Sequence, residues 1–392
     1  MRIGLMDATS PRSTHSSNET IYVMATAFRR CGCEVSLISS LKPRGILAPR
    51  MHRAVARLLA DDKICRDDRV VHTSLSSRHI NTAGSNQAVD VVLGLSSMDL
   101  AFEISGPSVL WGETRATLTV DKHPYHQRIN RRHIGEREKR EQAALDKSAL
   151  IVFPSEWAAD VACDRYSLDR GKVRVIPYGV NLPSALTEED IGECLRRRGS
   201  SEWELLFIGE DWKHEGVRVA IDTASILRAR GLNVHLTLVD CVPPQAAHVP
   251  EYVSTIPRID RTTLKGQTFL ASLYVQSHLL ILPGSRKDST TILSEAGAYG
   301  VPSLSTAVGN NGAVVINGVN GQLFPLEAEA IDYADYVLQL LVDPQRYTSL
   351  CWGSFKRVQT DLNWDVAVSK VVTEMGKVLQ PASEEYACIR AS

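Results

Sequence analysis

The sequence lacks any apolar run of the roughly 20 residues that a membrane-spanning helix needs. Its first residues lead directly into an expected strand, without the apolar stretch of a secretory signal. It also lacks a C-x-x-C pair, because its eight cysteines are scattered along the chain. This spacing speaks against a zinc site and against a disulfide framework. We therefore expect reduced cysteines and a cytoplasmic protein.

An excess of charge of either sign is missing as well. The net charge is −1, so the composition gives no indication of a nucleic-acid partner. No Asp-x-Asp triplet occurs, so a diphosphate held by a carboxylate-bound metal is not indicated either. We expect no metal and no resident cofactor.

Strand and helix patterns alternate twice along the 392 residues, a length that suits two globular domains. The first series has strands at residues 2–6, 34–38, 91–94, 108–111, 150–153 and 173–176, and helices at 20–30, 128–146 and 155–164. The second has strands at 204–208, 233–239 and 279–282, and helices at 217–230, 262–276, 290–300, 331–342, 345–359 and 366–378. Residues 182–201 are polar and weakly patterned, and residues 241–257 are expected to be rich in loop. The alternation predicts an α/β protein with two doubly wound parallel sheets and a ligand cleft at their strand ends.

The most informative segment spans residues 277–325. An apolar run at 279–282 predicts a buried strand, residues 283–289 a loop, and Thr290 the start of a helix that ends near Gly300. The unpaired N–H groups and the positive dipole end of such a helix suit a phosphate or diphosphate. Glu295 lies about one and a half turns into the helix, where its carboxylate could accept hydrogen bonds from a ribose.

Six stretches occur together in the order and spacing of a known family. They are SEWAAD (155–160), GKVRVIPYGVN (171–181), LLFIGEDWKHEG (205–216), SHLLILP (277–283), DSTTILSEAGAYGVPSLSTAVGNNG (288–312) and NGVNGQLFP (317–325), and LNWDVAVSKV (362–371) also fits. They resemble the retaining glycosyltransferases of family four, closely in the C-terminal half and loosely in the N-terminal half.

The resemblance implies the GT-B fold, in which two Rossmann-like domains face each other across a cleft. An acceptor domain is expected at residues 1–182 and a nucleotide-sugar donor domain at 183–365. A C-terminal helix and tail at 366–392 would cross back to the first domain.

The family's E-x7-E motif places its second acid at Glu295, whose implied role is to hold the donor ribose. The first acid falls on Lys287, and Asp288 is either its substitute at the sugar hydroxyls or only a cap of the helix. The implied phosphate ligands are the backbone N–H groups of the helix start, at Ser289, Thr290, Thr291 and Ile292. Gly209 is expected beside the donor from the neighbouring strand.

The family's diphosphate-binding lysine is replaced by Glu215. A glutamate aimed at a diphosphate would be repulsive, on the order of 1 kcal/mol. We expect Lys213 to act instead, supported by Arg286 or Lys287. The alternative is that Lys213 is an ordinary surface lysine.

In the N-terminal half, the implied donor contacts are Asn18 and Thr20, after the first strand. The loop at 7–19 has no glycine to allow close approach of the donor, and it carries Glu19. Glu113 or Thr114, after the strand at 108–111, is expected to reach the transferred sugar. Asp288, Glu113 and Lys213 are thus the candidate catalytic residues.

A glycine-rich turn at 309–312 also resembles the family, but Ala313 follows it where relatives carry an acid. The departures at Glu19, Glu215, Lys287 and Ala313 leave three interpretations open. The first is a hexosyltransferase-like enzyme that moves a sugar, with retention and without a metal, from a UDP- or GDP-linked donor. Its acceptor would be a glycan, a lipid-linked molecule or a small molecule, and the leaving diphosphate would accept the proton. The second is a glycosyltransferase-like scaffold with a degenerate donor site, and the third is a sugar-nucleotide epimerase of the same fold.

A basic stretch at 42–58 interleaves Lys42, Arg44, Arg50, Arg53 and Arg57 with apolar residues. It predicts either peripheral contact with the inner face of the membrane or a solvated helix face, which is the commoner outcome for a charge run. The sequence leaves the oligomeric state open.

Overall fold

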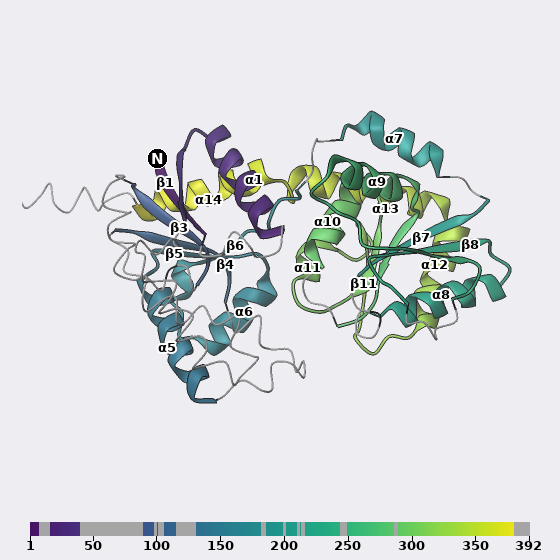
Figure 1. Ribbon diagram of the computed structural model, residues 1–392, viewed down its shortest axis with the longest axis horizontal. Coiled ribbons are helices and arrows are strands. Elements are labelled where there is room, and N and C mark those ends of the chain that lie inside the picture. The colour runs from purple at the N-terminus through teal and green to yellow at the C-terminus, as the bar shows by residue number, and fades with distance from the viewer. Residues whose placement is uncertain are drawn as a thin grey trace, which may run out of the picture. The chain divides into compact units, whose positions relative to one another are not determined.

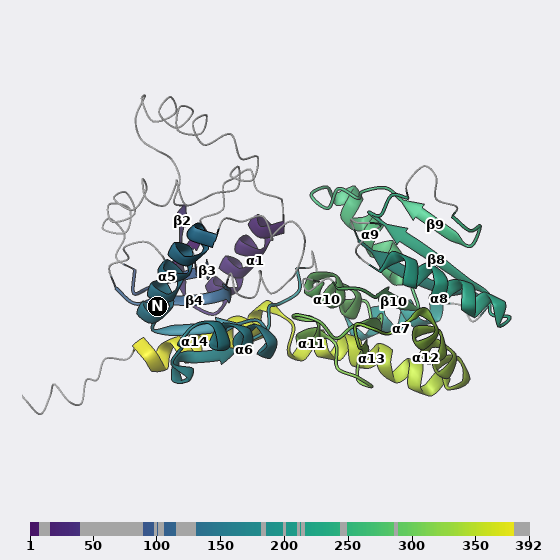
Figure 2. The same ribbon diagram turned by 90° about the horizontal axis from the view of Figure 1, so that it is seen from below.

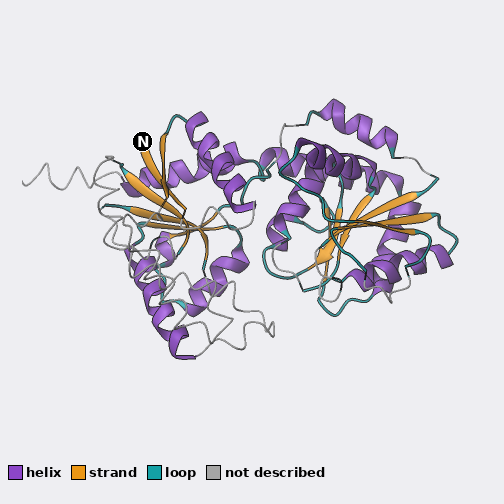
Figure 3. Ribbon diagram, in the orientation of Figure 1, coloured by secondary structure: helices purple, strands orange, loops and turns teal. Residues whose placement is uncertain are grey.

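The computed structural model describes residues 1–7, 16–39, 89–97, 100, 106–114, 131–181, 186–198, 201–209, 212, 216–243, 249–285 and 289–379. The chain divides into two compact units, Met1–Ile176 with Val368–Ser392 (unit 1) and Pro177–Ala367 (unit 2). Each unit places a six-stranded parallel sheet between helices, as far as the chain is described (Figure 1; Figure 3). The domain boundaries expected after residues 182 and 365 stay predictions.

The sheet of unit 1 has the strand order β2-β1-β3-β4-β5-β6. The strands are β1 (Arg2–Asp7), β2 (Glu34–Ser39), β3 (Val91–Ser96), β4 (Ser108–Glu113), β5 (Leu150–Phe153) and β6 (Val173–Val175). The helices are α1 (Ser16–Arg30), α5 (Arg131–Lys147), α6 (Glu156–Arg165) and α14 (Trp364–Leu379), with a 3-10 turn η3 (Arg170–Lys172). Ser155 is the N-cap of α6, and its side-chain hydroxyl accepts the N–H of Ala158 at 2.9 Å.

Both faces of this sheet are covered by helices, with α1 and α14 on one face and α5 and α6 on the other (Figure 1). The side chains of consecutive residues in β4 pack on opposite faces of the sheet. Leu110 packs with Leu145 of α5 and Ala158 of α6. Trp111 meets the ring of Phe28 from α1 edge-on, at 6.3 Å between ring centroids. The middle of β4, from Val109 to Trp111, is buried on both faces, which is why it reads as a continuous apolar run.

The sheet of unit 2 has the order β12-β11-β10-β7-β8-β9. The strands are β7 (Trp203–Ile208), β8 (Val234–Val239), β9 (Val253–Ile256), β10 (Leu279–Leu282), β11 (Ser303–Thr306) and β12 (Gly321–Phe324). The helices are α7 (Glu188–Arg197), α8 (Val217–Ala229), α9 (Leu264–Gln276), α10 (Thr290–Ala298), α11 (Asn311–Val314), α12 (Ala330–Val342) and α13 (Pro344–Thr360). Helix α8 packs beside α12 on one face, and α10 packs beside α13 on the other (Figure 2). None of the helices in the described part of the chain is long and apolar enough to span a bilayer.

Several elements differ from the sequence prediction, which did not include the short elements β11, β12 and α11. Residues 253–256, expected in a loop, form the edge strand β9, which is too short and too polar to show periodicity. The weakly patterned stretch before residue 201 contains α7, whose start is fixed by a capping box between Thr187 and Asp190. Helix α1 begins at Ser16, so Asn18 and Glu19 lie in its first turn and not in the expected loop.

A buried arginine joins the carboxyl ends of two helices in unit 2. Arg198, 7% exposed, donates to the carbonyls of Tyr299 and Gly300 after α10, each at 2.7 Å. Its Nε donates to the carbonyl of Val275 at 3.2 Å, in the last turn of α9. The guanidinium pairs carbonyls that have no partner within their helices, and its charge offsets the negative ends of both dipoles.

Replacing this arginine should destabilise unit 2. Arg198→Met keeps most of the apolar stem but leaves several buried carbonyls unpaired, which we expect to lower the free energy of unfolding by about 3 kcal/mol. Urea denaturation followed by circular dichroism measures the change. Arg196→Met is the matched control on the same helix, since Arg196 is exposed and pairs only with Glu193. Equal denaturation midpoints for the two variants would contradict the role given to Arg198.

Candidate functional site

The strand order of unit 2 reverses between β7 and β10. Strands β8 and β9 continue the sheet on one side of β7, whereas β11 and β12 continue it on the far side of β10. In doubly wound sheets, ligands bind outside the carboxyl ends of the strands at such a switch point. Helices α8 and α10 begin beyond the loops that follow these two strands.

The loops that follow β7 and β10 are in backbone contact. Gly216, the N-cap of α8, has a φ of 74°. A Cβ added to Gly216 would lie 2.0 Å from the carbonyl oxygen of Pro283. The next residue, Gly284, donates its N–H to Oγ1 of Thr306 at the end of β11, at 2.9 Å. The carboxyl ends of three strands are therefore tied together at this edge of the sheet.

Helix α10 starts at the same edge. Its N-cap residue, Ser289, is 4% exposed and makes no capping hydrogen bond with its own side chain. The carbonyl of Ser289 accepts the N–H of Leu293 at 2.9 Å, the first bond of the helix. The N–H groups of Thr290, Thr291 and Ile292 precede that bond, so they have no acceptor within the helix. Together with the helix dipole they form an arrangement suited to an anion.

Glu295 lies inside unit 2 and not on its surface. It is 8% exposed, and Nη1 of Arg261 donates to its two carboxylate oxygens at 3.2 and 3.1 Å. The hydroxyl of Tyr274 donates to Oε2 at 2.9 Å. Burial raises the pKa of Tyr274 well above its usual range, and the charge of Glu295 adds to this effect. Burial lowers the pKa of Arg261, but its interactions with Glu295, Tyr274 and Asp240 together outweigh burial, and the net pKa is raised.

The remaining predicted donor residues fall into two groups. Gly209 is buried, and its N–H donates to the carbonyl of Val239 at 3.0 Å, so this N–H serves the sheet. Lys213, Arg286, Lys287 and Asp288 lie outside the described residues, as does Glu215. Their predicted roles stay predictions.

The candidates of the N-terminal half belong to unit 1. Thr20 is half-buried near the start of α1, whereas the structure describes the backbone of Asn18 but not its side chain. Glu113 is the half-buried last residue of β4, and Thr114 follows it fully buried. The basic stretch at 42–58 lies outside the described residues.

Sequence reasoning missed a buried polar cluster in unit 1. Glu141 of α5 is fully buried and accepts hydrogen bonds from the hydroxyls of Ser97, just after β3, and of Tyr166, after α6. Burial raises the pKa of Tyr166, and its bond to Glu141 raises it further. A glutamate within a strongly charged helical stretch gives no sequence signal of burial. The cluster fixes the carboxyl end of β3 relative to α5 and α6.

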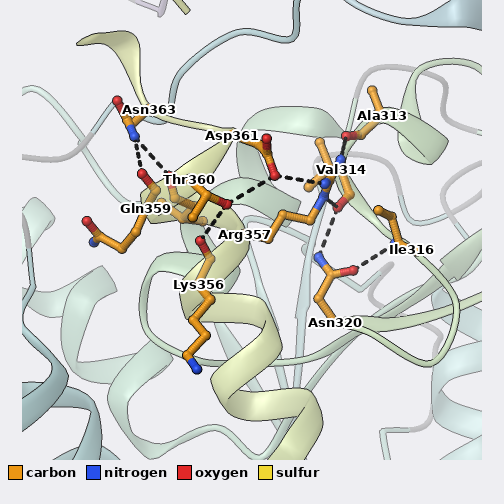
Figure 4. Close-up of polar contacts among 11 residues, drawn as sticks. Ala313, Val314, Ile316, Asn320, Lys356, Arg357, Gln359, Thr360, Asp361 and Asn363 are labelled. Carbon is orange, nitrogen blue, oxygen red and sulfur yellow. Dashed lines mark hydrogen bonds and ion pairs between the residues drawn. The ribbon is translucent and has the colours of Figure 1, made fainter. Parts of the chain in front are cut away.

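Two side chains contact the carboxyl end of helix α11, next to the glycine-rich turn (Figure 4). Arg357 of α13 donates to the carbonyls of Ala313 and Val314 at 2.7 and 3.0 Å. Asn320 donates to the carbonyl of Val314 at 2.9 Å and accepts the N–H of Ile316 at 2.7 Å. Burial lowers the pKa of Arg357. Helix α11, which follows the turn, is thus anchored at its carbonyl end.

Within the described residues, no group of three or more histidine, cysteine, aspartate or glutamate side chains is placed to hold a metal ion.

Known proteins share this site region. Residues 202–343, most of unit 2, match the family described as "Glycosyl transferases group 1". This segment, about a third of the chain, is similar to the glycosyl transferases group 1 family. The resemblance to the family-four glycosyltransferases is confirmed.

Curated relatives match a part of the chain. The D-inositol 3-phosphate glycosyltransferase of Salinispora arenicola is 28% identical over 268 residues, which are 63% of this chain and 59% of the relative. The protein of the same name from Paenarthrobacter aurescens is 25% identical over 252 residues, 61% of each chain. The similarity therefore extends over only about three fifths of the length of these relatives.

Solved structures share the fold over nearly the whole chain. Sucrose-phosphate synthase from Thermosynechococcus elongatus has a TM-score of 0.69 at 16% identity, covering 96% of this chain and 98% of its own. Anabaena HepE, solved in complex with UDP and glucose, has a TM-score of 0.61 at 12% identity, covering 96% and 99%. The predicted GT-B fold is confirmed.

The contact between the loops can be tested at Gly216. Gly216→Ala places a Cβ against the carbonyl of Pro283, so we expect it to destabilise unit 2 and to weaken anion binding at the start of α10. Gly231→Ala is the matched control, because Gly231 has a similar φ of 85° with nothing within 4 Å of an added Cβ. The control should lower the free energy of unfolding by about 1 kcal/mol, because alanine is strained in a left-handed backbone conformation. Gly216→Ala should lower it by at least twice as much. Equal costs in urea denaturation would refute the packing argument.

The anchoring of α11 can be tested at Arg357. Arg357→Met removes the donor at the carbonyl of Ala313 and leaves the carbonyl of Val314 to Asn320 alone, so the free energy of unfolding should fall by about 1 kcal/mol. The hydrogen-exchange protection of residues 311–316 should fall more than that of α12. Lys356→Met, at the exposed neighbouring position, should change neither quantity. Unchanged exchange at residues 311–316 in Arg357→Met would show that the turn is held by other contacts.

Proposed function

We propose that this chain is a retaining, metal-independent glycosyltransferase. It moves a sugar from a nucleoside diphosphate, UDP- or GDP-linked, to a glycan, lipid-linked or small-molecule acceptor. One observation carries the proposal: helix α10 begins at the switch point of the sheet, with the buried and paired Glu295 behind its first turn.

The proposed donor site combines an anion subsite with a ribose subsite. The N–H groups at the start of α10 suit the diphosphate, whose charge the helix dipole also favours. The carboxylate of Glu295 is the proposed acceptor for the ribose hydroxyls. A carboxylate offers about four lone-pair positions, so pairing with Arg261 and Tyr274 is compatible with this role.

The transfer step needs charge stabilisation more than a general base. As the bond to the sugar breaks, negative charge develops on the diphosphate, and donors fixed in advance lower the barrier. The start of α10 would supply such donors, with Lys213 and either Arg286 or Lys287 as the proposed cations. The leaving diphosphate would take the proton of the acceptor hydroxyl, and Asp288 and Glu113 would contact the transferred sugar.

The acceptor class is suggested by the relatives and not by the site. The curated relatives are named for D-inositol 3-phosphate, which makes a small phosphorylated polyol the first acceptor to test. The structure of HepE with UDP and glucose similarly makes UDP-glucose the first donor to test. A cytoplasmic location, with peripheral membrane contact through residues 42–58, is part of the proposal.

Nucleotide binding tests the donor site directly. A panel of UDP-, GDP- and ADP-sugars is screened by thermal unfolding, and one of them should raise the midpoint, since a ligand at 100 times its Kd stabilises by about 2.7 kcal/mol. Glu295→Gln should lower kcat/KM for that donor about 10- to 100-fold, because hydrogen bonds to a charged group are lost. Glu188→Gln, an exposed glutamate of α7, is the control.

Three other results would each overturn the proposal. If no nucleotide raises the midpoint, there is no donor site. Binding of a nucleotide-sugar without transfer to a phosphorylated polyol, a glycan or a lipid-linked acceptor would favour the degenerate scaffold. Conversion of the nucleotide-sugar with no acceptor present would favour the epimerase.

A further inference from the structure

We infer that Arg261 is a positioning residue that makes the donor site selective for a ribonucleoside diphosphate, by fixing the carboxylate of Glu295. The inference rests on the proposed function, because it takes Glu295 as the ligand of the ribose. It concerns a residue that the donor-site motif does not include.

The backbone between β9 and Arg261 is held by a residue that follows the neighbouring strand, β8. Asp240 follows β8, and its Oδ1 accepts the N–H of Ile259 at 2.7 Å. Among the described residues, Asp240 is the only one besides glycine with a positive φ, 62°. Such a conformation costs free energy and persists where the surrounding contacts require it. The bond from Asp240 therefore sets the path of the chain just before Arg261.

The turn that carries Arg261 is fixed from both sides. Oδ1 of Asp260 accepts the N–H of Thr262 at 3.0 Å, and the amide of Gln267 donates to the carbonyl of Arg261 at 3.0 Å. Gly266 allows this closeness, since a Cβ there would lie 2.0 Å from the carbonyl oxygen of Asp260. Because the backbone of Arg261 is fixed on both sides, its Cα has a defined position, and this limits where the guanidinium can lie.

That guanidinium determines where the carboxylate lies. Nη1 of Arg261 bridges both oxygens of Glu295, and the hydroxyl of Tyr274 adds a third bond at Oε2. Tyr274 is itself fixed by stacking on Tyr299, at 5.4 Å between ring centroids and 15° between planes. The carboxylate is therefore held by two donors from different segments, one after β9 and one in α9.

Loss of the guanidinium would change the state of Glu295. The side chain of Glu295 is only 11% exposed, and that of Arg261 is 33% exposed. A buried carboxylate that loses this ion pair is less stable in its charged form, so it takes up a proton or turns toward water. In either case it no longer presents fixed acceptors to the ribose. Selection for the 2′-hydroxyl should then decrease, whereas the diphosphate subsite at the start of α10 should remain.

The test compares ribo- and deoxyribonucleotides. Calorimetry measures the Kd of UDP and of 2′-deoxy-UDP, or of GDP and 2′-deoxy-GDP if the panel selects guanine. The wild-type protein should prefer the ribonucleotide by about tenfold or more, the value of one hydrogen bond to a charged group. Arg261→Met should reduce this preference to less than about threefold.

Three further variants complete the experiment. Glu295→Gln should reduce the preference to the same extent, and the double variant should reduce it no further, because the two residues act through one carboxylate. Arg261→Lys keeps the positive charge but cannot bridge both carboxylate oxygens, so it should show an intermediate preference for the ribonucleotide. This variant serves as the test if Arg261→Met does not fold. Arg230→Met, which removes an arginine–aspartate pair on the surface of unit 2, should leave the preference unchanged.

The contrary outcomes are distinguishable. If Arg261→Met keeps the wild-type preference and only unfolds more easily, Arg261 is merely structural and the inference fails. If it weakens both nucleotides equally but leaves uridine or guanosine binding unchanged, Arg261 contacts the diphosphate, and the inference fails again. A wild-type protein that binds both nucleotides equally overturns the ribose role of Glu295 while the donor site stands. A wild-type protein that binds neither overturns the proposed function itself.

Discussion

Helix α10 is buried along most of its length, so every polar group on it needs a partner inside the protein. All of its residues from Ile292 to Ala298 are buried. Its carboxyl end is paired by Arg198, and its one buried charge, on Glu295, is paired by Arg261. The first turn is different, because its N–H groups have no acceptor within the helix. The helix therefore offers hydrogen-bond donors only at the edge of the sheet where a ligand would bind.

The same constraint explains why distant parts of the chain meet around this helix. Arg198 follows α7, Arg261 follows β9, and Tyr274 lies in α9, yet all three contact α10 or the residues directly after it. Pro283 and Gly284, directly after β10, are in turn held by Gly216 and Thr306, from the segments after β7 and in β11. These contacts fix the described part of this edge of the sheet in one position, as the proposed donor site would require.

Three arginines of unit 2 are already paired within the fold, which limits what can hold a diphosphate. Arg198 and Arg357 each donate to carbonyl groups at helix ends, and Arg261 pairs with Glu295. Each of these cations already serves the fold, so the charge of a diphosphate falls to the start of α10 and to the proposed Lys213, Arg286 or Lys287. Whether the exchange of the family's lysine for Glu215 is compensated then depends on those three side chains.

The amino-acid sequence by itself determined the alternation of strands and helices, the strand–loop–helix around Thr290 and the place of Glu295 within it, because these follow from local periodicity and caps. It also determined that residues 202–343 carry a family's motifs. It could not show that Glu295 is paired with Arg261, since an arginine in a polar loop after a short edge strand has no pattern of its own. It equally could not show the burial of Arg198 or Glu141, because each lies in a charged stretch typical of a surface. Only the tertiary structure decided these pairs, since the free energy of a buried charge depends on which distant groups the fold brings beside it.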